Sequence, residues 1–368
     1  MTNYDLKFIA ANFEIEGNFH SAEPFGNGHI NDTFLISMAE KNNRHYLLQR
    51  INDHVFRNVP QLMQNIENVT RHIRNKIRNI PGADPERNCM TFIPAGNGKP
   101  FYQDDDGNLW RACYFIENSF SYDSVKSPEH ARQGGLAFGN FQKLLADFPA
   151  KLLHETIPNF HNVDVRLESF YRTIKRDPFK RTQAGSKEIR FIENRADEMH
   201  HILHLGDKGK IATRITHNDT KFNNVLFDKS GKFLCVIDLD TVMPGYVHYD
   251  FGDAIRTGCN TGSEDDPNLE KVELNIIFFE AYTNGFLHET KSFLSTIEIE
   301  NLAFSAKLLT YIMGLRFLTD YFDGDNYYKI HHKNHNLQRA RAQFKLLESM
   351  ESQYSRMQAI ILQQAGLG

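Results

Sequence analysis

Residues 215–256 constrain the fold more than any other part of the chain. They read ITHNDTKFNNVLFD, a short turn, FLCVIDLDTVMPG and then YVHYDFGDAIR. The runs 225–227 and 233–237 are rich in β-branched and aromatic residues, and the sequence KSG between them suits a tight turn. The pattern therefore predicts a β-hairpin that is flanked by polar and acidic side chains.

The acidic and amide side chains of this stretch are spaced for metal binding. Asn224 precedes the first predicted strand and Asp238 follows the second, so a hairpin brings them to the same end. Carboxylate and amide oxygens that face one opening suit a hard dication such as Mg²⁺. Asp219 stands just upstream, where a carboxylate can accept a hydroxyl proton, and a bound dication would offset its repulsion from Asp238.

A single aspartate in such a loop would be explained best as the cap of a turn. His217, Asn218 and Asp219, however, follow an apolar approach at residues 211–215. The combination HxDxxxxN, an apolar strand and then IDxD has the spacing of a phosphoryl-transfer loop. We therefore interpret the stretch as a catalytic loop followed by a metal-binding turn.

Composition and charge limit the classes of partner. The chain has 368 residues, of which 40% are hydrophobic and 24% charged, which fits a globular protein of one large domain or two lobes. The formal net charge of −4 argues against a nucleic-acid or anionic-membrane partner. Four cysteines without a CxxC pair predict reduced, buried thiols. We see no signal peptide and no apolar run of membrane-spanning length, and we expect a cytoplasmic protein with a small-molecule substrate and no obligatory protein partner.

The first third of the chain favours strands. Gly26 and Gly28 form a Gly-x-Gly turn that can cradle phosphate, although a plain hairpin has the same signature. Arg50 lies in an apolar strand and can reach a phosphate or point to water. Glu67, on a helix with apolar residues at helical spacing, can pair with Arg50 or remain solvated. We place a boundary near residue 118.

The remainder of the chain favours helices. Ser127 followed by proline is a helix start, and long helices are expected over residues 268–286, 296–322 and 337–361. His200, His201 and His204 share one helix. We interpret them as capping or solvated side chains rather than zinc ligands, because no HExxH pattern accompanies them.

The central motifs resemble the aminoglycoside phosphotransferase and choline kinase superfamily. Within it, HNDTKFNNVLFD and VIDLDTVMPGYVHYDFGDAIR look closest to N-acetylhexosamine 1-kinases. The resemblance implies an α+β, protein-kinase-like fold of two lobes. Residues 1–118 would form the small, β-rich nucleotide-binding lobe with its hinge, and residues 119–368 the larger, mainly helical lobe with the catalytic loop and the sugar site.

The resemblance also implies ATP and Mg²⁺ as cofactors and a role for each matching residue. Asp219 would be the catalytic base that orients the acceptor hydroxyl, and Asn224 and Asp238 would hold the metal. Further roles implied are phosphate contacts (Gly26, Gly28, Arg50 with Glu67), an adenine-binding hinge (Ile116, Glu117, Asn118) and support of the loop (His217, Asp240, Asp250). For Asp240 a second-metal contact, a sugar contact and a purely structural role all remain open.

Two positions depart from the superfamily pattern. Asn218 stands where most members have glycine after the loop histidine. Arg50 stands where protein kinases have the strand lysine, and arginine stays charged but presents a different geometry. Neither departure removes a group that the reaction needs.

The expected activity is phosphorylation of the anomeric hydroxyl of N-acetylglucosamine or N-acetylgalactosamine, in amino-sugar salvage. Candidate sugar contacts are His29 and Arg316, with Tyr327 and Tyr328 as stacking platforms; a surface arginine and ordinary aromatic packing are the plainer alternatives. A kinase of choline, an aminoglycoside or another sugar is the competing enzyme hypothesis. A nucleotide-binding pseudokinase is the competing non-enzyme hypothesis, and the presence of Asp219, Asn224 and Asp238 argues against it.

Overall fold

The structure is a computed structural model that describes residues 4–26, 30–39 and 44–368. It separates into two compact units, neither of which is one continuous stretch of chain. The first unit comprises residues 1–120, 147–157 and 226–244, and the second comprises 121–146, 158–225 and 245–368. The mixed α+β composition expected from the sequence is confirmed, because most of the strands are in the first unit and most of the helices are in the second.

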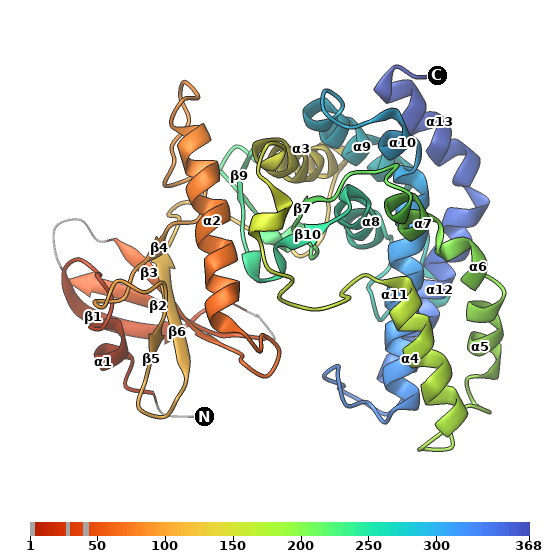
Figure 1. The fold of residues 1–368 in the computed structure, drawn as a ribbon, viewed down its shortest axis with the longest axis horizontal. Helices are drawn as coiled ribbons and strands as arrows, with labels where there is room; N and C mark the ends of the chain where they lie inside the picture. Colours follow the sequence, from red (N-terminus) through yellow and green to blue (C-terminus); the bar gives the residue numbers. More distant parts are fainter. Residues whose placement is uncertain (1–3, 27–29, 40–43) are drawn as a thin grey trace. The chain divides into compact units, whose positions relative to one another are not determined.

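The first unit is built on an antiparallel sheet in the order β1-β2-β3-β6-β4, with β5 also paired to β6 (Figure 1). Gly26 leaves β1 with a φ of 76°, in the left-handed region that glycine adopts without strain. Gly28 and His29 lie outside the described residues. The elements of this part of the chain are α1 (Leu6–Ala10), β1 (Asn18–Pro24), β2 (Asp32–Ala39), β3 (His45–Ile51), α2 (Val59–Ile77), β4 (Phe92–Ile93), β5 (Tyr102–Gln103) and β6 (Leu109–Tyr114).

The sheet has an apolar core on the side of α1. Alternate residues of β3, Tyr46 and Leu48, pack there with Trp110 and Ala112 of β6 and with Ile9 of α1. Helix α2 lies along the other side of the sheet (Figure 1). Its buried face contains the apolar stripe expected from the sequence: Leu62, Ile66, Val69 and Ile73.

The predicted hairpin is present as β8 (Val225–Phe227) and β9 (Phe233–Val236). Its turn is closed by Asp228, and Gly231 has a φ of 81°. Most of the hairpin belongs to the first unit, because Phe227 bridges Phe120 and the Leu234 carbonyl accepts a hydrogen bond from Asn88 at 3.0 Å. The first break, after residue 120, is close to the expected boundary at 118, but the simple division into 1–118 and 119–368 misses this return of the chain.

The second unit is mainly helical. Two buried clusters surround α11, one shared with α4 and α12 and the other with α8, α9 and α13. The elements are α3 (Pro128–Leu145), α4 (Val163–Arg176), α5 (Ser186–Glu193), α6 (Ala196–Met199), α7 (His201–Asp207), β7 (Arg214–Thr216), α8 (Val247–Gly258), α9 (Ile276–Thr290), α10 (Thr296–Glu300), α11 (Leu302–Phe322), α12 (His335–Ser352) and α13 (Tyr354–Ala365). Strand β10 (Met243–Gly245) begins in the first unit and ends in the second, because the division of the chain falls after Pro244.

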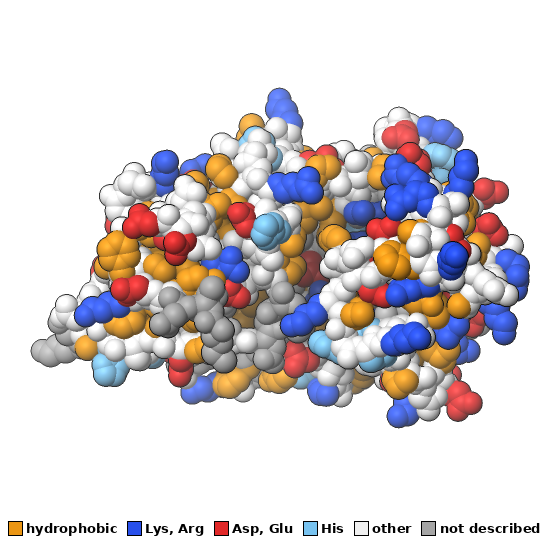
Figure 2. Space-filling view, turned by 90° about the horizontal axis from the view of Figure 1, so that it is seen from below, with side chains coloured by type: hydrophobic (Ala, Val, Ile, Leu, Met, Phe, Trp, Pro, Cys, Tyr) orange, Lys and Arg blue, Asp and Glu red, His pale blue; other side chains and the backbone are white. Residues whose placement is uncertain are grey.

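Helix α11 is long and apolar enough to cross a membrane by length and composition, which the sequence reasoning did not anticipate. In the most apolar window of this helix 83% of the residues are buried inside the protein. That burial is typical of the core helix of a globular domain. On the face shown in Figure 2, acidic and basic side chains are intermixed, in keeping with the small net charge.

Each of the three long helices expected near the C-terminus is either shorter in the structure or divided into two helices. Residues 268–275 are not part of α9, which begins after Asn275, whose side chain caps Ile277 and Phe278. A break at Asn301 separates α10 from α11, and a break at Gln353 separates α12 from α13. The Gln353 side chain donates to the Leu274 carbonyl at 3.1 Å, which fixes this second break.

Candidate active site

The loop after β7 is held by a buried carboxylate. Asp250, in α8, accepts hydrogen bonds from the backbone N–H groups of His217 at 2.9 Å and Asn218 at 2.8 Å. Gln142 donates to the same carboxylate at 2.7 Å. Burial raises the pKa of Asp250 even though these bonds favour its charged form. The expected support of the loop by Asp250 is therefore present in the structure.

The backbone angle at position 218 explains why asparagine can stand where most members of the superfamily have glycine. Its φ is 65°, in the left-handed region where glycine is unstrained and asparagine is the best-tolerated alternative. Its side chain is also bonded locally, since it accepts from the Thr216 hydroxyl at 3.0 Å. His217 is buried against the ring edges of Phe138 and Phe141, so it acts as an internal support of the loop.

Asp219 faces a lysine that the sequence analysis overlooked. Its side chain is 26% exposed, and the Lys221 ammonium lies 3.1 Å from one carboxylate oxygen. Burial disfavours the charge on Asp219, but Lys221, His217 and Arg256 together favour it and hold the pKa of Asp219 below its ordinary value. The carboxylate is thus ionised and able to accept a proton. The signal available in the sequence was that Lys221 stands inside the HxDxxxxN motif, two residues after Asp219.

Asn224 has the orientation that a metal ligand needs. Its side-chain nitrogen donates to the Asp219 backbone carbonyl at 2.9 Å and to the Asp219 carboxylate at 3.2 Å. The amide oxygen therefore points elsewhere, and within the described chain it accepts no hydrogen bond. An unused hard oxygen of this kind fits Mg²⁺.

Asp238, the other expected metal ligand, lies in the first unit. It is exposed at the end of β9 and has a φ of 59°, in the left-handed region. No group of three or more His, Cys, Asp or Glu residues in the described parts of the chain is arranged to hold a metal by itself. Mg²⁺ that is bound by one or two protein oxygens together with substrate phosphates requires no such group.

Asp240 is placed in a buried polar network. It forms an ion pair with Arg111 of β6 and accepts from the Asn31 side chain at 2.7 Å. Arg111 also donates to Gln49 of β3 at 2.9 Å. Because Asp240 and Arg111 are each at most 4% exposed, the structure supports the structural role among the three left open for Asp240.

The structure corrects the assignment of Arg50 and Glu67. Arg50 lies directly opposite Asp32 across β2 and β3, and its guanidinium pairs with that carboxylate at 2.7 Å. Glu67 is exposed on α2, so the expected Arg50–Glu67 ion pair is wrong. Strand alternation places Arg50 on the side of the sheet that carries Tyr4, whereas Gln49 and Arg111 face the segment that contains Asp240. This geometry argues against Arg50 as a phosphate contact.

The expected hinge is ordered by its own hydrogen bonds. Ile116 is buried, and its carbonyl accepts from the Ser119 hydroxyl at 2.6 Å. The Glu117 side chain contacts His45 at 2.6 Å, and its carbonyl accepts from Arg87 at 2.7 Å. Asn118 has a φ of 52°. Adenine binding by this segment stays a prediction.

Arg316, Tyr327 and Tyr328, three of the candidate sugar contacts, lie together in the second unit, and sugar binding by them stays a prediction. The Arg316 guanidinium lies 5.7 Å and 5.6 Å from the centres of the two tyrosine rings, and 5.1 Å from that of Phe160. Arg166 of α4 donates to the Phe160 carbonyl at 2.9 Å, and burial with the nearby Arg316 lowers its pKa to about 10. We call these five residues the arginine–tyrosine cluster.

The fold holds the residues of the arginine–tyrosine cluster in place. Arg316 lies inside α11 and is half-buried, so the alternative of a surface charge at a helix end does not hold. Asp320, one helical turn later, accepts backbone N–H groups of Asn326, Tyr327 and Tyr328 at 2.8–2.9 Å. This carboxylate fixes the loop that carries both tyrosines, a role that the sequence analysis did not foresee.

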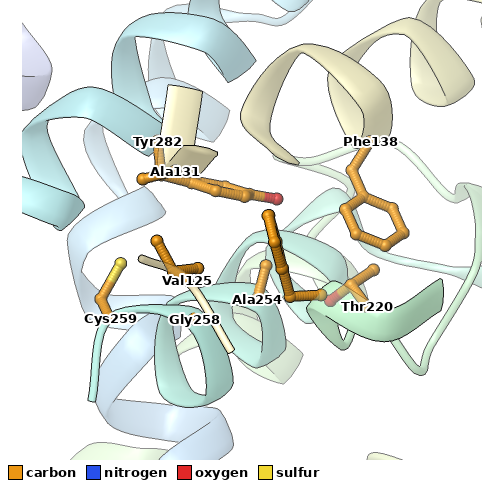
Figure 3. A pocket seen from close by; sticks show the side chains of 9 residues that line it. Val125, Ala131, Phe138, Thr220, Ala254, Gly258, Cys259 and Tyr282 are labelled. Carbon is orange, nitrogen blue, oxygen red and sulfur yellow. The ribbon is translucent and has the colours of Figure 1, made fainter. Parts of the chain in front are cut away.

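A small cavity lies beneath the catalytic loop. Residues of α3, α8 and α9 line it together with Thr220 and Phe222, and Figure 3 shows the Tyr282 hydroxyl directed toward it. This hydroxyl is buried without a partner in the described chain, and burial raises its pKa. The cavity has room for about one water molecule, so it cannot hold a substrate.

Comparison with known families identifies the chain. The model of the APH phosphotransferase enzyme family matches residues 21–282, well over half of the sequence. The chain belongs to this family. It is therefore a small-molecule phosphotransferase that uses an alcohol as acceptor.

Solved structures show the same fold at low sequence identity. An aminoglycoside phosphotransferase from Alicyclobacillus acidocaldarius subsp. acidocaldarius DSM 446 is 12% identical, covers 100% of this chain and 98% of its own, and has a TM-score of 0.64. A microcompartment-associated aminopropanol kinase is 15% identical over 95% of this chain and 97% of its own, with a TM-score of 0.65. An amicoumacin kinase in complex with AMP-PNP and Ca²⁺ is 12% identical over 93% of both chains, with a TM-score of 0.60.

Proposed function

We propose that the protein transfers the γ-phosphoryl group of ATP, with Mg²⁺, to the anomeric hydroxyl of an N-acetylhexosamine, giving the sugar 1-phosphate. The similarity of its central motifs to N-acetylhexosamine 1-kinases supports this substrate class. One structural observation carries the proposal: consecutive residues join the Asp219 loop to the arginine–tyrosine cluster. The Phe160 ring lies against Arg316, and His161 contacts the Asn218 carbonyl at 3.1 Å.

The transfer itself requires alignment and charge neutralisation rather than covalent catalysis. The Asp219 carboxylate would accept the proton of the acceptor hydroxyl as its oxygen forms a bond to the γ-phosphorus. The bond from that phosphorus to the β,γ-bridging oxygen would break, leaving ADP. Lys221 favours the ionised form of Asp219, and Asn224 donates to the same carboxylate through its amide nitrogen. Asn224 and Asp238 would bind Mg²⁺, which neutralises phosphate charge, as the complex of the amicoumacin kinase with AMP-PNP and Ca²⁺ suggests by analogy.

The charge of the arginine–tyrosine cluster favours a neutral acceptor. Neither Arg166 nor Arg316 has a carboxylate partner in the described chain, so both guanidinium charges are uncompensated there. A cationic acceptor such as choline or an aminoglycoside would be repelled at this position. A neutral sugar can accept hydrogen bonds from Arg316 on its hydroxyl and acetyl oxygens and can stack on Tyr327, which is 63% exposed.

The test is an ADP-release assay with ATP, Mg²⁺ and a panel of acceptors. The panel contains N-acetylglucosamine, N-acetylgalactosamine, glucose, choline and kanamycin, and ³¹P and ¹³C NMR identify the phosphorylated carbon. We expect turnover with at least one N-acetylhexosamine and phosphorylation at C1. Turnover with choline or kanamycin alone would overturn the sugar assignment and support the alternative acceptor.

A variant of Asp219 tests the mechanism separately from the substrate. Asp219→Asn keeps the size of the side chain but removes the proton acceptor, so we expect turnover to fall at least 10³-fold while ATP binding by calorimetry is retained. Retained activity would remove Asp219 from its assigned role. We propose the cytoplasm as the place of action, since the reaction requires ATP.

A further inference from the structure

His161 is a buried histidine to which the proposed phosphoryl transfer assigns no role of its own. It follows Phe160 in the segment before α4, and only 5% of its surface is exposed. Its ring lies 4.5 Å from the Phe160 ring and 5.2 Å from the Tyr249 ring, measured between centres. Its Nε2 atom lies 3.1 Å from the backbone carbonyl oxygen of Asn218.

The contact fixes the tautomer of the ring. A carbonyl oxygen can only accept, so Nε2 of His161 carries the proton and donates it to Asn218. The other ring nitrogen is then an acceptor, and it is buried without a partner in the described chain. Burial, reinforced by the positive charges of Arg316, Arg166 and Arg256, lowers the pKa of His161 to about 3, so the ring is neutral at physiological pH.

The carbonyl oxygen that His161 contacts belongs to the peptide unit that joins Asn218 to Asp219. The carbonyl of Asn218 and the N–H of Asp219 are the two polar ends of one planar group. The Asp219 N–H donates to Nδ1 of His217 at 3.3 Å, while the carbonyl accepts from His161 at 3.1 Å. Two histidines therefore hold both ends of the peptide that leads into Asp219. The rotation of this peptide sets the direction in which the Asp219 carboxylate leaves the backbone.

We propose that His161 is a positioning residue: it clamps the Asn218–Asp219 peptide from the side of the arginine–tyrosine cluster and thereby aligns Asp219 with the acceptor. The role of Asp219 as base rests on the proposed function. The clamp itself is a property of the fold and can be measured without any acceptor. It assigns a purpose to a segment that contacts both Arg316, through Phe160, and the catalytic loop, through His161.

The chain provides a matched control. His248 of α8 is also fully buried, donates to a backbone carbonyl through Nε2 (Glu298, 3.0 Å) and has an Nδ1 atom without a partner in the described chain. Its partner lies in α10 rather than in the catalytic loop. Substitutions at His161 and His248 thus remove the same interaction at comparable burial, and only one of them touches the peptide before Asp219.

The kinetic experiment compares His161→Leu, His161→Gln, His248→Leu and His248→Gln. The glutamine nitrogen reaches about as far as Nε2, so it can restore the donor. We expect His161→Leu to lower kcat at least 10-fold with the KM for ATP changed less than 2-fold, and His161→Gln to recover most of the loss. His248→Leu should lower Tm to a similar extent but leave kcat within about 2-fold. Equal kcat losses for the two leucine variants, or no rescue by glutamine, would overturn the proposal.

A measurement that needs no substrate separates this inference from the sugar assignment. In ¹⁵N-histidine NMR spectra of the whole protein, we expect His161 as the neutral Nε2–H tautomer from pH 8 down to pH 5. Amide hydrogen exchange at Asp219 should become at least 10-fold faster in His161→Leu but not in His248→Leu. A proton on Nδ1, or unchanged exchange, would refute the clamp even if hexosamines are phosphorylated. If the spectra and exchange agree and no hexosamine reacts, the substrate proposal alone fails.

Discussion

Asn218 shows how a single backbone angle can decide which residues a catalytic loop accepts. Its φ of 65° turns the chain between the buried His217 and the partly exposed Asp219. Glycine adopts this angle freely and asparagine adopts it with little strain, whereas a β-branched residue does not. Asparagine at position 218 therefore keeps the backbone conformation that glycine would adopt, although its side chain adds polar groups that glycine lacks.

We predict that Asn218→Val lowers the free energy of unfolding by about 1–3 kcal/mol and also lowers activity, because valine is strained at this positive φ. Asn218→Gly is the control, and it should cost at most about 1 kcal/mol through loss of the bond to Thr216. Urea unfolding followed by circular dichroism measures both. A valine variant as stable as the glycine variant would contradict the argument from φ.

Among single residues, spacing along the chain was the reliable guide. Asp219 and Asn224 are joined by a local hydrogen bond, so the motif alone predicts their proximity. The phosphate contact predicted for Arg50 is not supported, because a one-residue step along a strand moves a side chain to the other face of the sheet. The sequence reads QR at this point, and nothing local indicates which of the two residues faces Asp240.

At the scale of elements, α3 and α9 approach so closely that only glycine fits at their contact. A Cβ atom built on Gly285 would lie 2.1 Å from the Arg132 carbonyl oxygen, and one on Gly135 would lie 2.1 Å from the Tyr282 carbonyl oxygen. Backbone atoms cannot move aside as a flexible side chain can. The two helices therefore depend on this pair of glycines.

We predict that Gly285→Ala destabilises the protein by about 3 kcal/mol or more, because the added methyl group forces the backbones of α3 and α9 apart. Gly96→Ala is the matched control, since the nearest atom to its Cβ would be 3.8 Å away. Thermal unfolding should show a large fall in Tm for the first variant and almost none for the second. Similar Tm values would argue against the close approach.

The ion pair of Arg111 and Asp240 connects β6 to the segment that follows Asp238. Arg111→Met leaves a carboxylate that is 4% exposed without its counter-charge, so we predict a loss of about 3–5 kcal/mol of stability. The double variant Arg111→Met with Asp240→Leu should recover part of it, because no buried charge then remains unpaired. Chemical denaturation of the two variants decides this. If the double variant is the less stable one, the buried charge is not the cause.

Across the whole molecule the four cysteines behave as the sequence analysis expected, as buried free thiols. Burial raises the pKa of Cys89 to about 12 and that of Cys113 to about 11, and it raises those of Cys235 and Cys259 as well. Both units contribute thiols, since Cys259 is in the second unit and the others are in the first. Thiol reactivity therefore reports on the integrity of the entire fold.

We predict that Ellman's reagent at pH 8 labels fewer than one thiol per native chain and four after denaturation, because the buried thiols are both protonated and inaccessible. Ser352→Cys, at an exposed position at the end of α12, should add one rapidly labelled thiol to the native protein. Rapid labelling of the native parent chain would show that at least one cysteine is accessible.

The sequence by itself determined the hairpin, the loop motif HxDxxxxN and the amphipathic α2. Each of these depends on interactions within a few residues, such as turn geometry, helical periodicity and the local bond between Asn224 and Asp219. Only the tertiary structure decided that Asp240 pairs with Arg111, that Arg50 faces away from that network, and that Phe160 and His161 join Arg316 to the catalytic loop. These contacts link segments that are distant in the sequence, and their partners are selected by how helices and strands pack rather than by spacing along the chain.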